Sequence, residues 1–105
     1  MPRFNKAFFF IQEKKFESGL KQYKKIEYVG DTNIVDVIEF VEKEFEKTND
    51  NFGLLFVAGW LNMRYADQVR GVSQLQDFLL KSNGQQEYNP LIVEAQKVLA
   101  IEAQK

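Results

Sequence analysis

Residues 52–65, FGLLFVAGWLNMRY, and residues 66–80, ADQVRGVSQLQDFLL, decide the fold of this chain. The first segment is apolar around most of the circumference that it would have as a helix, and the second is amphipathic with helical spacing. Neither segment contains a proline. We therefore predict two helices joined by a tight bend at Ala66 and Asp67. The first helix must be covered on several sides, by other parts of the same domain or by a partner.

Two more amphipathic helices are predicted before this pair. Apolar residues at helical spacing indicate one helix over residues 14–28 and another over about residues 32–47, starting at Thr32 or Asn33. The side-chain oxygens of Thr32 and Asn33 can accept hydrogen bonds from the free amides of a first helical turn. The second helix has an acidic face, and its apolar stripe consists of Ile34, Ile38, Val41 and Phe45.

The C-terminal part of the chain carries a stop signal and a start signal. Ser82-Asn83-Gly84 should end the helix that contains residue 80, because Gly84 can adopt a positive φ. Asn89 is the expected cap of a last helix. Pro90 then takes its first helical position, where a missing N–H costs no hydrogen bond. A C-terminal helix from Pro90 onward is therefore predicted.

The N-terminal segment leaves two alternatives open. AFFFIQ at residues 7–12 can be a helix or a buried strand, and residues 26–41 can be interpreted as two further strands of an α+β domain. Strand alternation fails in NIVDVIEFV at residues 33–41, where the apolar positions favour a helix. We therefore predict an all-α fold of five or six antiparallel helices in a single domain over residues 1–105.

The composition excludes several classes of chemistry. The chain contains no cysteine and no histidine, so thiolate metal sites, disulfides, thiol nucleophiles and the usual general bases are missing. Neither a phosphate-binding glycine loop nor a calcium loop is present. We expect no enzyme activity, no cofactor and no metal. No segment is apolar over enough residues to span a bilayer or to act as a secretory signal, so a cytoplasmic location is expected.

Charge is distributed unevenly along the chain. Residues 1–25 carry seven lysines and arginines against two glutamates, whereas residues 26–50 carry eight acidic residues against two lysines. These regions are either solvated faces of neighbouring helices that attract each other weakly, or a docking surface. Nucleic-acid binding is not expected, because the acidic region directly follows the basic one and the net charge is −1.

Small residues recur at corresponding places in two predicted helix pairs. Ala7 and Gly19 in the first pair correspond to Gly59 and Gly71 in the second, each displaced by 52 residues. Small residues at both points of closest approach allow two helices to pack backbone to backbone.

This pattern resembles the tetratricopeptide repeat, a hairpin of two antiparallel helices. The matching residues of the first unit are Ala7, Phe16, Gly19 and Tyr23, and those of the second unit are Leu55, Ala58, Gly59, Gly71 and Leu75. The sequence departs from the family at Asn62 and Phe78 and has no proline that closes either unit. The helix at 32–47 is left unpaired between the units, whereas the family repeats about every 34 residues.

The resemblance implies a short array of helical hairpins with a C-terminal capping helix. The first helix of each hairpin lines the inner surface of such an array, and that surface binds a peptide or a helix of a partner. The inward positions correspond to Asn5, Phe8, Gln12, Trp60, Met63 and Arg64. Trp60 lies on so apolar a helix that a place in the core is the competing interpretation.

The sequence thus predicts a non-catalytic protein-interaction module, an adaptor, scaffold or chaperone-like protein that binds a peptide or helix of another protein. Self-association is a further possibility. The alternative is a small α+β regulatory or inhibitory protein, of the antitoxin or immunity type, whose acidic helix at 32–47 neutralises a basic target. The two hypotheses differ in fold, because the second requires a sheet.

Overall fold

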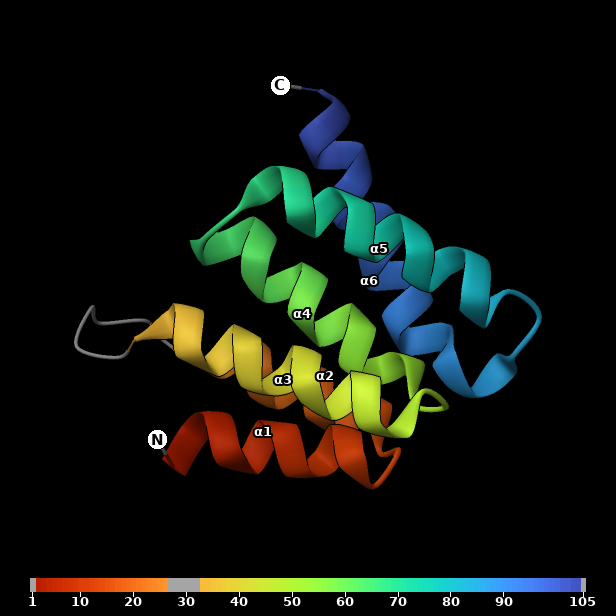
Figure 1. Cartoon of the computed structure of the whole chain (residues 1–105). Helices are drawn as coiled ribbons and strands as arrows, with labels where there is room; N and C mark the ends of the chain where they lie inside the picture. Colours follow the sequence, from red (N-terminus) through yellow and green to blue (C-terminus); the bar gives the residue numbers. More distant parts are fainter. Residues whose placement is uncertain (1, 27–32, 105) are drawn as a thin grey trace.

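The computed structural model describes residues 2–26 and 33–104, which form six α-helices and one short 3₁₀ helix (Figure 1). The elements are α1 (Pro2–Gln12), α2 (Phe16–Lys25), α3 (Ile34–Thr48), α4 (Phe52–Tyr65), α5 (Gln68–Ser82), η1 (Gln86–Tyr88) and α6 (Asn89–Ala103). No strand occurs within the described ranges, so the predicted all-α fold is confirmed. The α+β alternative is wrong for the parts of its strands that are described, whereas residues 27–32 lie outside the described residues.

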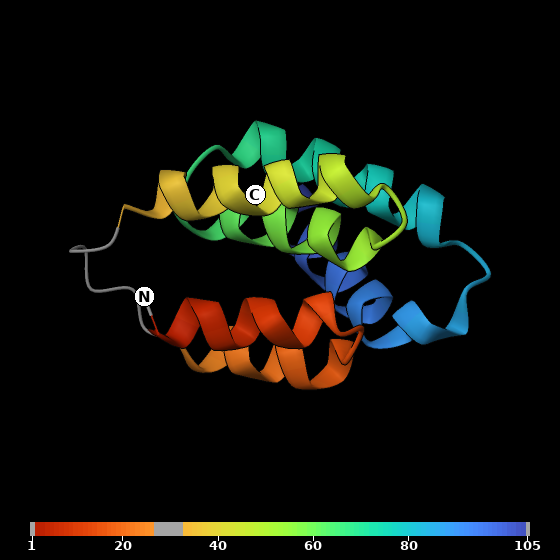
Figure 2. The ribbon, with the colours of Figure 1, turned by 60° about the horizontal axis from the view of Figure 1, so that its bottom comes forward.

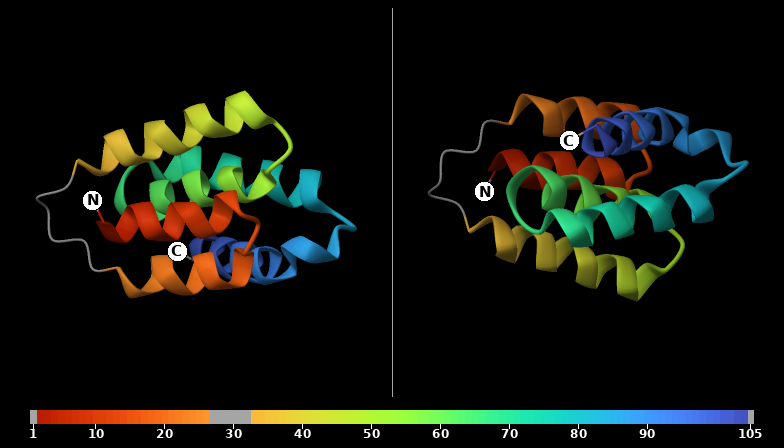
Figure 3. Two further views of the ribbon diagram at one scale, coloured as in Figure 1. Left: turned by 90° about the horizontal axis from the view of Figure 1, so that it is seen from below. Right: turned by 90° about the horizontal axis from the view of Figure 1, so that it is seen from above.

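The helices form two layers (Figure 2). α1 and α2 lie side by side in one layer, and α3, α4 and α5 lie in the other. Seen from below, α1 lies between α2 and α3 (Figure 3). α6 packs against α2, α4 and α5 and so connects the layers, while its C-terminal end extends away from the other helices (Figure 1).

Several helix ends lie where the sequence predicts them. Asn33 caps α3 by accepting a hydrogen bond from the backbone N–H of Asp36 at 3.4 Å. Asp67 caps α5 in the same way, accepting from the N–H of Arg70 at 3.1 Å, so the predicted bend between the two central helices is confirmed. Gly84 follows α5 with a φ of 83° and ends it as expected.

Two predicted helix starts are wrong. The helix predicted from residue 14 begins at Phe16, because Lys14 adopts a positive φ of 63° in the turn after α1. Asn89 is not the cap of α6, because its backbone is helical (φ −49°, ψ −47°) and Tyr88 at the end of η1 takes that place. Pro90 is therefore the second residue of α6, where its missing N–H still removes no helical hydrogen bond.

α4 is the central helix, and it is enclosed as its apolar sequence predicts. All eleven residues from Gly53 to Met63 are buried. α1, α3, α5 and α6 all pack against this helix. A fully buried large side chain such as Phe56 or Leu61 contributes roughly 1.5–3 kcal/mol relative to an exposed one, so α4 is a main source of the stability of the fold.

The helix predicted to stand unpaired at residues 32–47 packs against α4, which corrects that prediction. Its buried residues belong to the predicted stripe and are Ile34, Ile38 and Val41. α3 is also joined to α5, since Arg70 Nε and Gln74 Nε2 donate to the Glu42 carboxylate at 2.9 and 2.6 Å. The pattern of small residues could not predict this packing, because α3 makes it through large side chains.

Glycines allow the closest contacts between helices. A Cβ atom on Gly71 would lie 2.8 Å from the carbonyl oxygen of Gly59 and 2.8 Å from the backbone nitrogen of Met63. α5 therefore crosses α4 with almost no side chain between the two backbones. In the α1–α2 hairpin, a Cβ atom on Gly19 would lie 2.6 Å from Cδ1 of Ile11. The predicted backbone-to-backbone packing is thus confirmed for α4 and α5, whereas Gly19 makes room for the side chain of Ile11 and does not meet Ala7.

Gly71→Ala should lower the free energy of unfolding by about 1–3 kcal/mol, because the added methyl group meets backbone atoms of α4 that cannot rotate away. Denaturant unfolding measures the change. Ser73→Ala, an exposed substitution on the same helix, is the control and should change stability by less than about 0.5 kcal/mol. Wild-type stability of Gly71→Ala would contradict the close approach of α4 and α5.

Candidate functional site

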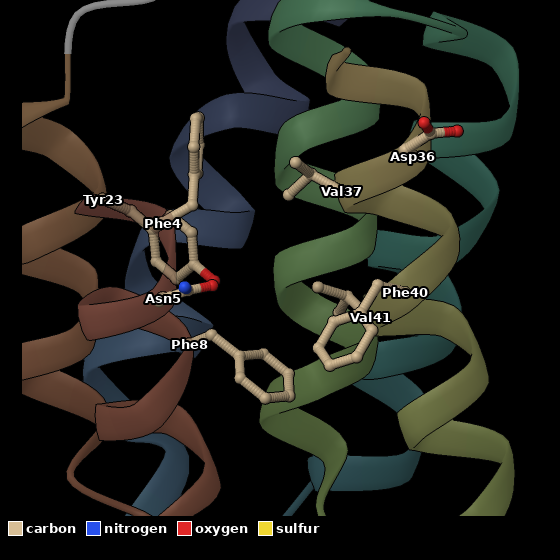
Figure 4. A pocket seen from close by; sticks show the side chains of 8 residues that line it. All are labelled: Phe4, Asn5, Phe8, Tyr23, Asp36, Val37, Phe40 and Val41. Atoms are coloured by element: carbon tan, nitrogen blue, oxygen red, sulfur yellow. The ribbon is translucent and has the colours of Figure 1, made fainter. Parts of the chain in front are cut away.

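An apolar groove lies between α1 and α3 (Figure 4) and is termed the α1–α3 groove. Its volume is about 230 Å³. α1 contributes Phe4, Asn5 and Phe8, α2 contributes Tyr23, and α3 contributes Asp36, Val37, Phe40 and Val41. The groove thus lies between the basic part of the chain, which contains α1 and α2, and the acidic helix α3.

Helical spacing places these side chains on facing sides of α1 and α3. Phe4 and Phe8 are one turn apart on α1, and Val37 and Val41 are one turn apart on α3. Phe8 and Phe40 meet across the groove, with ring centroids 5.0 Å apart and an angle of 58° between the ring planes. Tilted ring pairs of this kind attract each other beyond the burial of their area. The two helices are therefore held together here by aromatic contact.

Aromatic surface beside the groove is open to solvent. Phe40 is 52% exposed, and Phe9, which follows Phe8 on α1, is 58% exposed. Phe4 and Val41, in contrast, are buried. Single exposed apolar residues are common on proteins, but a hollow that combines buried and exposed rings is typical of a binding surface.

Two polar groups beneath this groove are buried without a partner. The hydroxyl of Tyr23 makes no hydrogen bond within the described residues, and neither does the indole N–H of Trp60. Their ring centroids are 6.0 Å apart. Burial raises the pKa of the Tyr23 hydroxyl well above its ordinary value, so this group keeps its proton. Each unpaired buried polar group lowers the free energy of unfolding by about 1–3 kcal/mol, so these two groups destabilise the fold.

Asp36 is the charged residue among those that line the groove. Its carboxylate takes part in none of the ion pairs between described residues. The groove therefore combines apolar walls, one buried hydroxyl and one free carboxylate. These groups suit the binding of an apolar side chain that has a polar or basic neighbour. The residues that line the groove include no pair of nucleophile and base.

The residues predicted as partner contacts on α1 lie in or near the groove. Asn5 and Phe8 line it, and Gln12, one turn beyond Phe8, is exposed. These positions were implied by the resemblance to the tetratricopeptide repeat, and helical spacing puts them on one side of α1.

The residues predicted as contacts on α4 lie elsewhere. Trp60 and Met63 are buried, with 2% and 8% of their surface exposed. Arg64 is exposed, and its guanidinium lies 4.8 Å from the centre of the Trp60 ring, a cation–π contact. Trp60 thus takes the core position that was the competing interpretation, and only Asn5 and Phe8 of the predicted set come together in the groove.

Sequence analysis missed the wall that α3 contributes. Val37 and Phe40 lie outside the apolar stripe that packs α3 into the core. The signal was present, because this helix carries more apolar residues than one stripe needs. Tyr23 was named only as a match to the repeat pattern, and nothing in the sequence indicates that its hydroxyl has no partner.

A second hollow lies between α5 and α6. Its volume is about 550 Å³, and its lining residues are Gln76, Leu79, Leu80, Asn83, Ile92 and Gln96. It contains no aromatic ring and no buried polar group without a partner. It therefore offers less specific recognition than the α1–α3 groove.

The described residues show neither a metal-binding cluster nor a membrane-spanning helix. No three acidic side chains among them gather in a way that could hold a metal ion. None of their helices has both the length and the apolar character needed to cross a bilayer.

Two buried tyrosines allow a matched test of the unpaired hydroxyl. Tyr23→Phe should leave the free energy of unfolding unchanged or raise it, because no hydrogen bond is lost. Tyr88→Phe should lower it by about 1 kcal/mol, since the Tyr88 hydroxyl accepts from the N–H of Phe52 at 3.2 Å and donates to the carbonyl of Asp50 at 3.4 Å. Thermal unfolding measures both variants. An equal loss of stability in the two would show that the Tyr23 hydroxyl is bonded after all.

No protein-family model, curated protein or solved structure matches this chain. Its function is therefore argued from the geometry of its own residues.

Proposed function

We propose that this chain is a non-catalytic protein-interaction module, an adaptor or chaperone-like protein that binds an apolar peptide or helix of a partner in the α1–α3 groove. The observation that carries the proposal is the groove itself, a hollow lined by aromatic and aliphatic side chains from two neighbouring helices. Such a hollow is the usual receptor for the apolar face of an amphipathic helix or for one or two anchor side chains.

The composition of the groove supports this function. Aromatic residues dominate the binding energy of protein interfaces, and the Phe8–Phe40 pair spans this groove from one helix to the other. Phe40 and Phe9 keep large exposed fractions that a partner would cover. The aromatic surplus of the sequence, with ten phenylalanines in 105 residues, is thus partly explained by a surface and not by the core alone.

The proposed binding surface differs from the one that the resemblance to the tetratricopeptide repeat implies. The helices of each hairpin, α1 with α2 and α4 with α5, pack against each other, which is compatible with a helical repeat. The binding surface differs from the expected one, because α4 is enclosed and α3 takes its place opposite α1. We therefore assign recognition to α1 and α3, with Asn5 and Phe8 kept from the predicted contacts.

The alternative hypothesis, an inhibitor that neutralises a basic target through its acidic helix, has less support. Glu42 is bonded to Arg70 and Gln74, and Glu44 is paired with Lys47 at 3.3 Å. These intramolecular contacts reduce the free negative charge that α3 could offer. No observation in the described residues favours this function over binding in the groove.

Phe40→Asp should abolish peptide binding while leaving the fold intact. Peptides selected from a random library on the wild-type chain would be titrated against the variant, and their affinity should fall at least about tenfold, because a carboxylate replaces a central apolar contact. Phe40 is 52% exposed, so the fold should stay intact, and loss of the Phe8–Phe40 contact should lower the free energy of unfolding by about 0.5–1.5 kcal/mol.

Leu80→Asp is the matched control for this measurement. Leu80 is 78% exposed on α5, outside the groove, so the same apolar-to-acidic change should leave peptide affinity unaltered. Peptides that keep their affinity for Phe40→Asp, or that lose it equally for Leu80→Asp, would remove the groove as the binding site.

A further inference from the structure

The size of the α1–α3 groove limits what it can hold. Its volume of about 230 Å³ is below the range of roughly 300–1,000 Å³ that is typical of sites for drug-sized ligands. One side chain with a flat ring fits such a volume, whereas an extended cofactor does not. Rings of Phe4, Phe8 and Phe40 in the walls favour an aromatic occupant, because stacked and edge-on ring contacts then become available.

The Tyr23 hydroxyl gives the groove a polar end. Tyr23 is 2% exposed and lines the groove, and its hydroxyl has no partner among the described residues. The other buried tyrosine, Tyr88, has its hydroxyl bonded to two backbone groups, so an unpaired hydroxyl is not a general feature of this core. The second unpaired buried group is the indole N–H of Trp60, whose ring centroid is 6.0 Å from that of Tyr23. Both unsatisfied groups therefore lie at one place in the core, which indicates a site that a bound group completes.

Asn5 and Tyr23 line the same groove. Figure 4 shows the hydroxyl end of Tyr23 and the side chain of Asn5 at the same level of the groove, between Phe4 and Phe8. Asn5 is exposed, so its side chain can turn outward without breaking any core contact. A bound group in the groove can therefore bond the Tyr23 hydroxyl once the side chains that cover it move, and the Asn5 amide offers a further donor and acceptor beside it.

Charge adds a second feature to the occupant. Asp36 lies at the outer edge of the groove, where its exposed carboxylate points away from Phe4 and Tyr23 (Figure 4) and is not used by any described ion pair. A partner with a lysine or arginine next to its aromatic anchor would gain an ion pair at this position, whereas an acidic neighbour would be repelled.

We propose that the partner segment bound by the α1–α3 groove inserts a tyrosine side chain, whose phenol hydroxyl bonds to the Tyr23 hydroxyl, and carries a basic residue beside it that faces Asp36. This inference rests on the proposed function and specifies its ligand. A phenol is favoured over a plain phenyl ring because it can both donate to and accept from Tyr23.

Three small molecules on one scaffold test each feature separately. Ethylbenzene carries the ring alone, 4-ethylphenol adds the hydroxyl, and tyramine adds the ammonium group. The chain has one tryptophan, so its single indole N–H resonance in an NMR spectrum reports binding close to Tyr23, whose ring centroid is 6.0 Å from that of Trp60. Titration of the full chain with each compound gives its dissociation constant.

The wild-type chain and Tyr23→Phe should differ in the ratio of the dissociation constants of ethylbenzene and 4-ethylphenol. The preference for 4-ethylphenol over ethylbenzene should be about three- to tenfold larger in the wild type, which corresponds to one neutral hydrogen bond. Tyr88→Phe is the matched control and should keep the wild-type ratio. Asp36→Asn should lower the preference for tyramine over 4-ethylphenol by a few-fold and leave the hydroxyl preference intact.

The outcomes separate this inference from the proposed function. An equal ratio in wild type and Tyr23→Phe, with binding still abolished by Phe40→Asp, would overturn the tyrosine anchor and leave the groove as a binding site for rings. Failure of all three compounds to shift the indole resonance would overturn the inference. The peptide titrations against Phe40→Asp would then decide the proposed function on their own.

Discussion

The contact on which the rest of the structure depends is the crossing of α5 over α4 at Gly71 and Gly59. Because neither residue has a side chain, the two backbones approach until a Cβ atom on Gly71 would touch the carbonyl of Gly59. This approach brings Phe78 against Phe56, with ring centroids 5.4 Å apart, and closes one side of α4. The remaining sides of that apolar helix must then be covered by α1, α3 and α6, which sets the arrangement of both layers.

The α1–α3 groove follows from how α3 meets this requirement. α3 uses Ile34, Ile38 and Val41 in the core, but its sequence carries a second apolar strip with Val37 and Phe40. That strip faces α1, where only Phe8 reaches across to it. The groove therefore arises because α3 carries more apolar surface than it buries in the core. For the same reason the proposed binding surface lies on α3 and not on the enclosed α4.

The sequence predicts the elements of this fold well, because each depends on a local signal. Helical spacing, the caps at Asn33 and Asp67 and the positive φ at Gly84 all act within one turn of the chain. The start at Asn89 was wrong because η1 leads directly into α6 and replaces the side-chain cap. The packing of α3 on α4 and the unpaired Tyr23 hydroxyl depend on contacts between distant segments, which no local pattern encodes. Asn5 and Phe8 were found for the groove, whereas its α3 wall was not.

The most direct measurement of the central claim is an NMR structure of the chain bound to a library-selected peptide, with intermolecular proton contacts assigned. The account predicts contacts from an aromatic residue of the peptide to Phe8, Val37 and Phe40. Contacts confined to the hollow between α5 and α6, around Leu80 and Ile92, would contradict it.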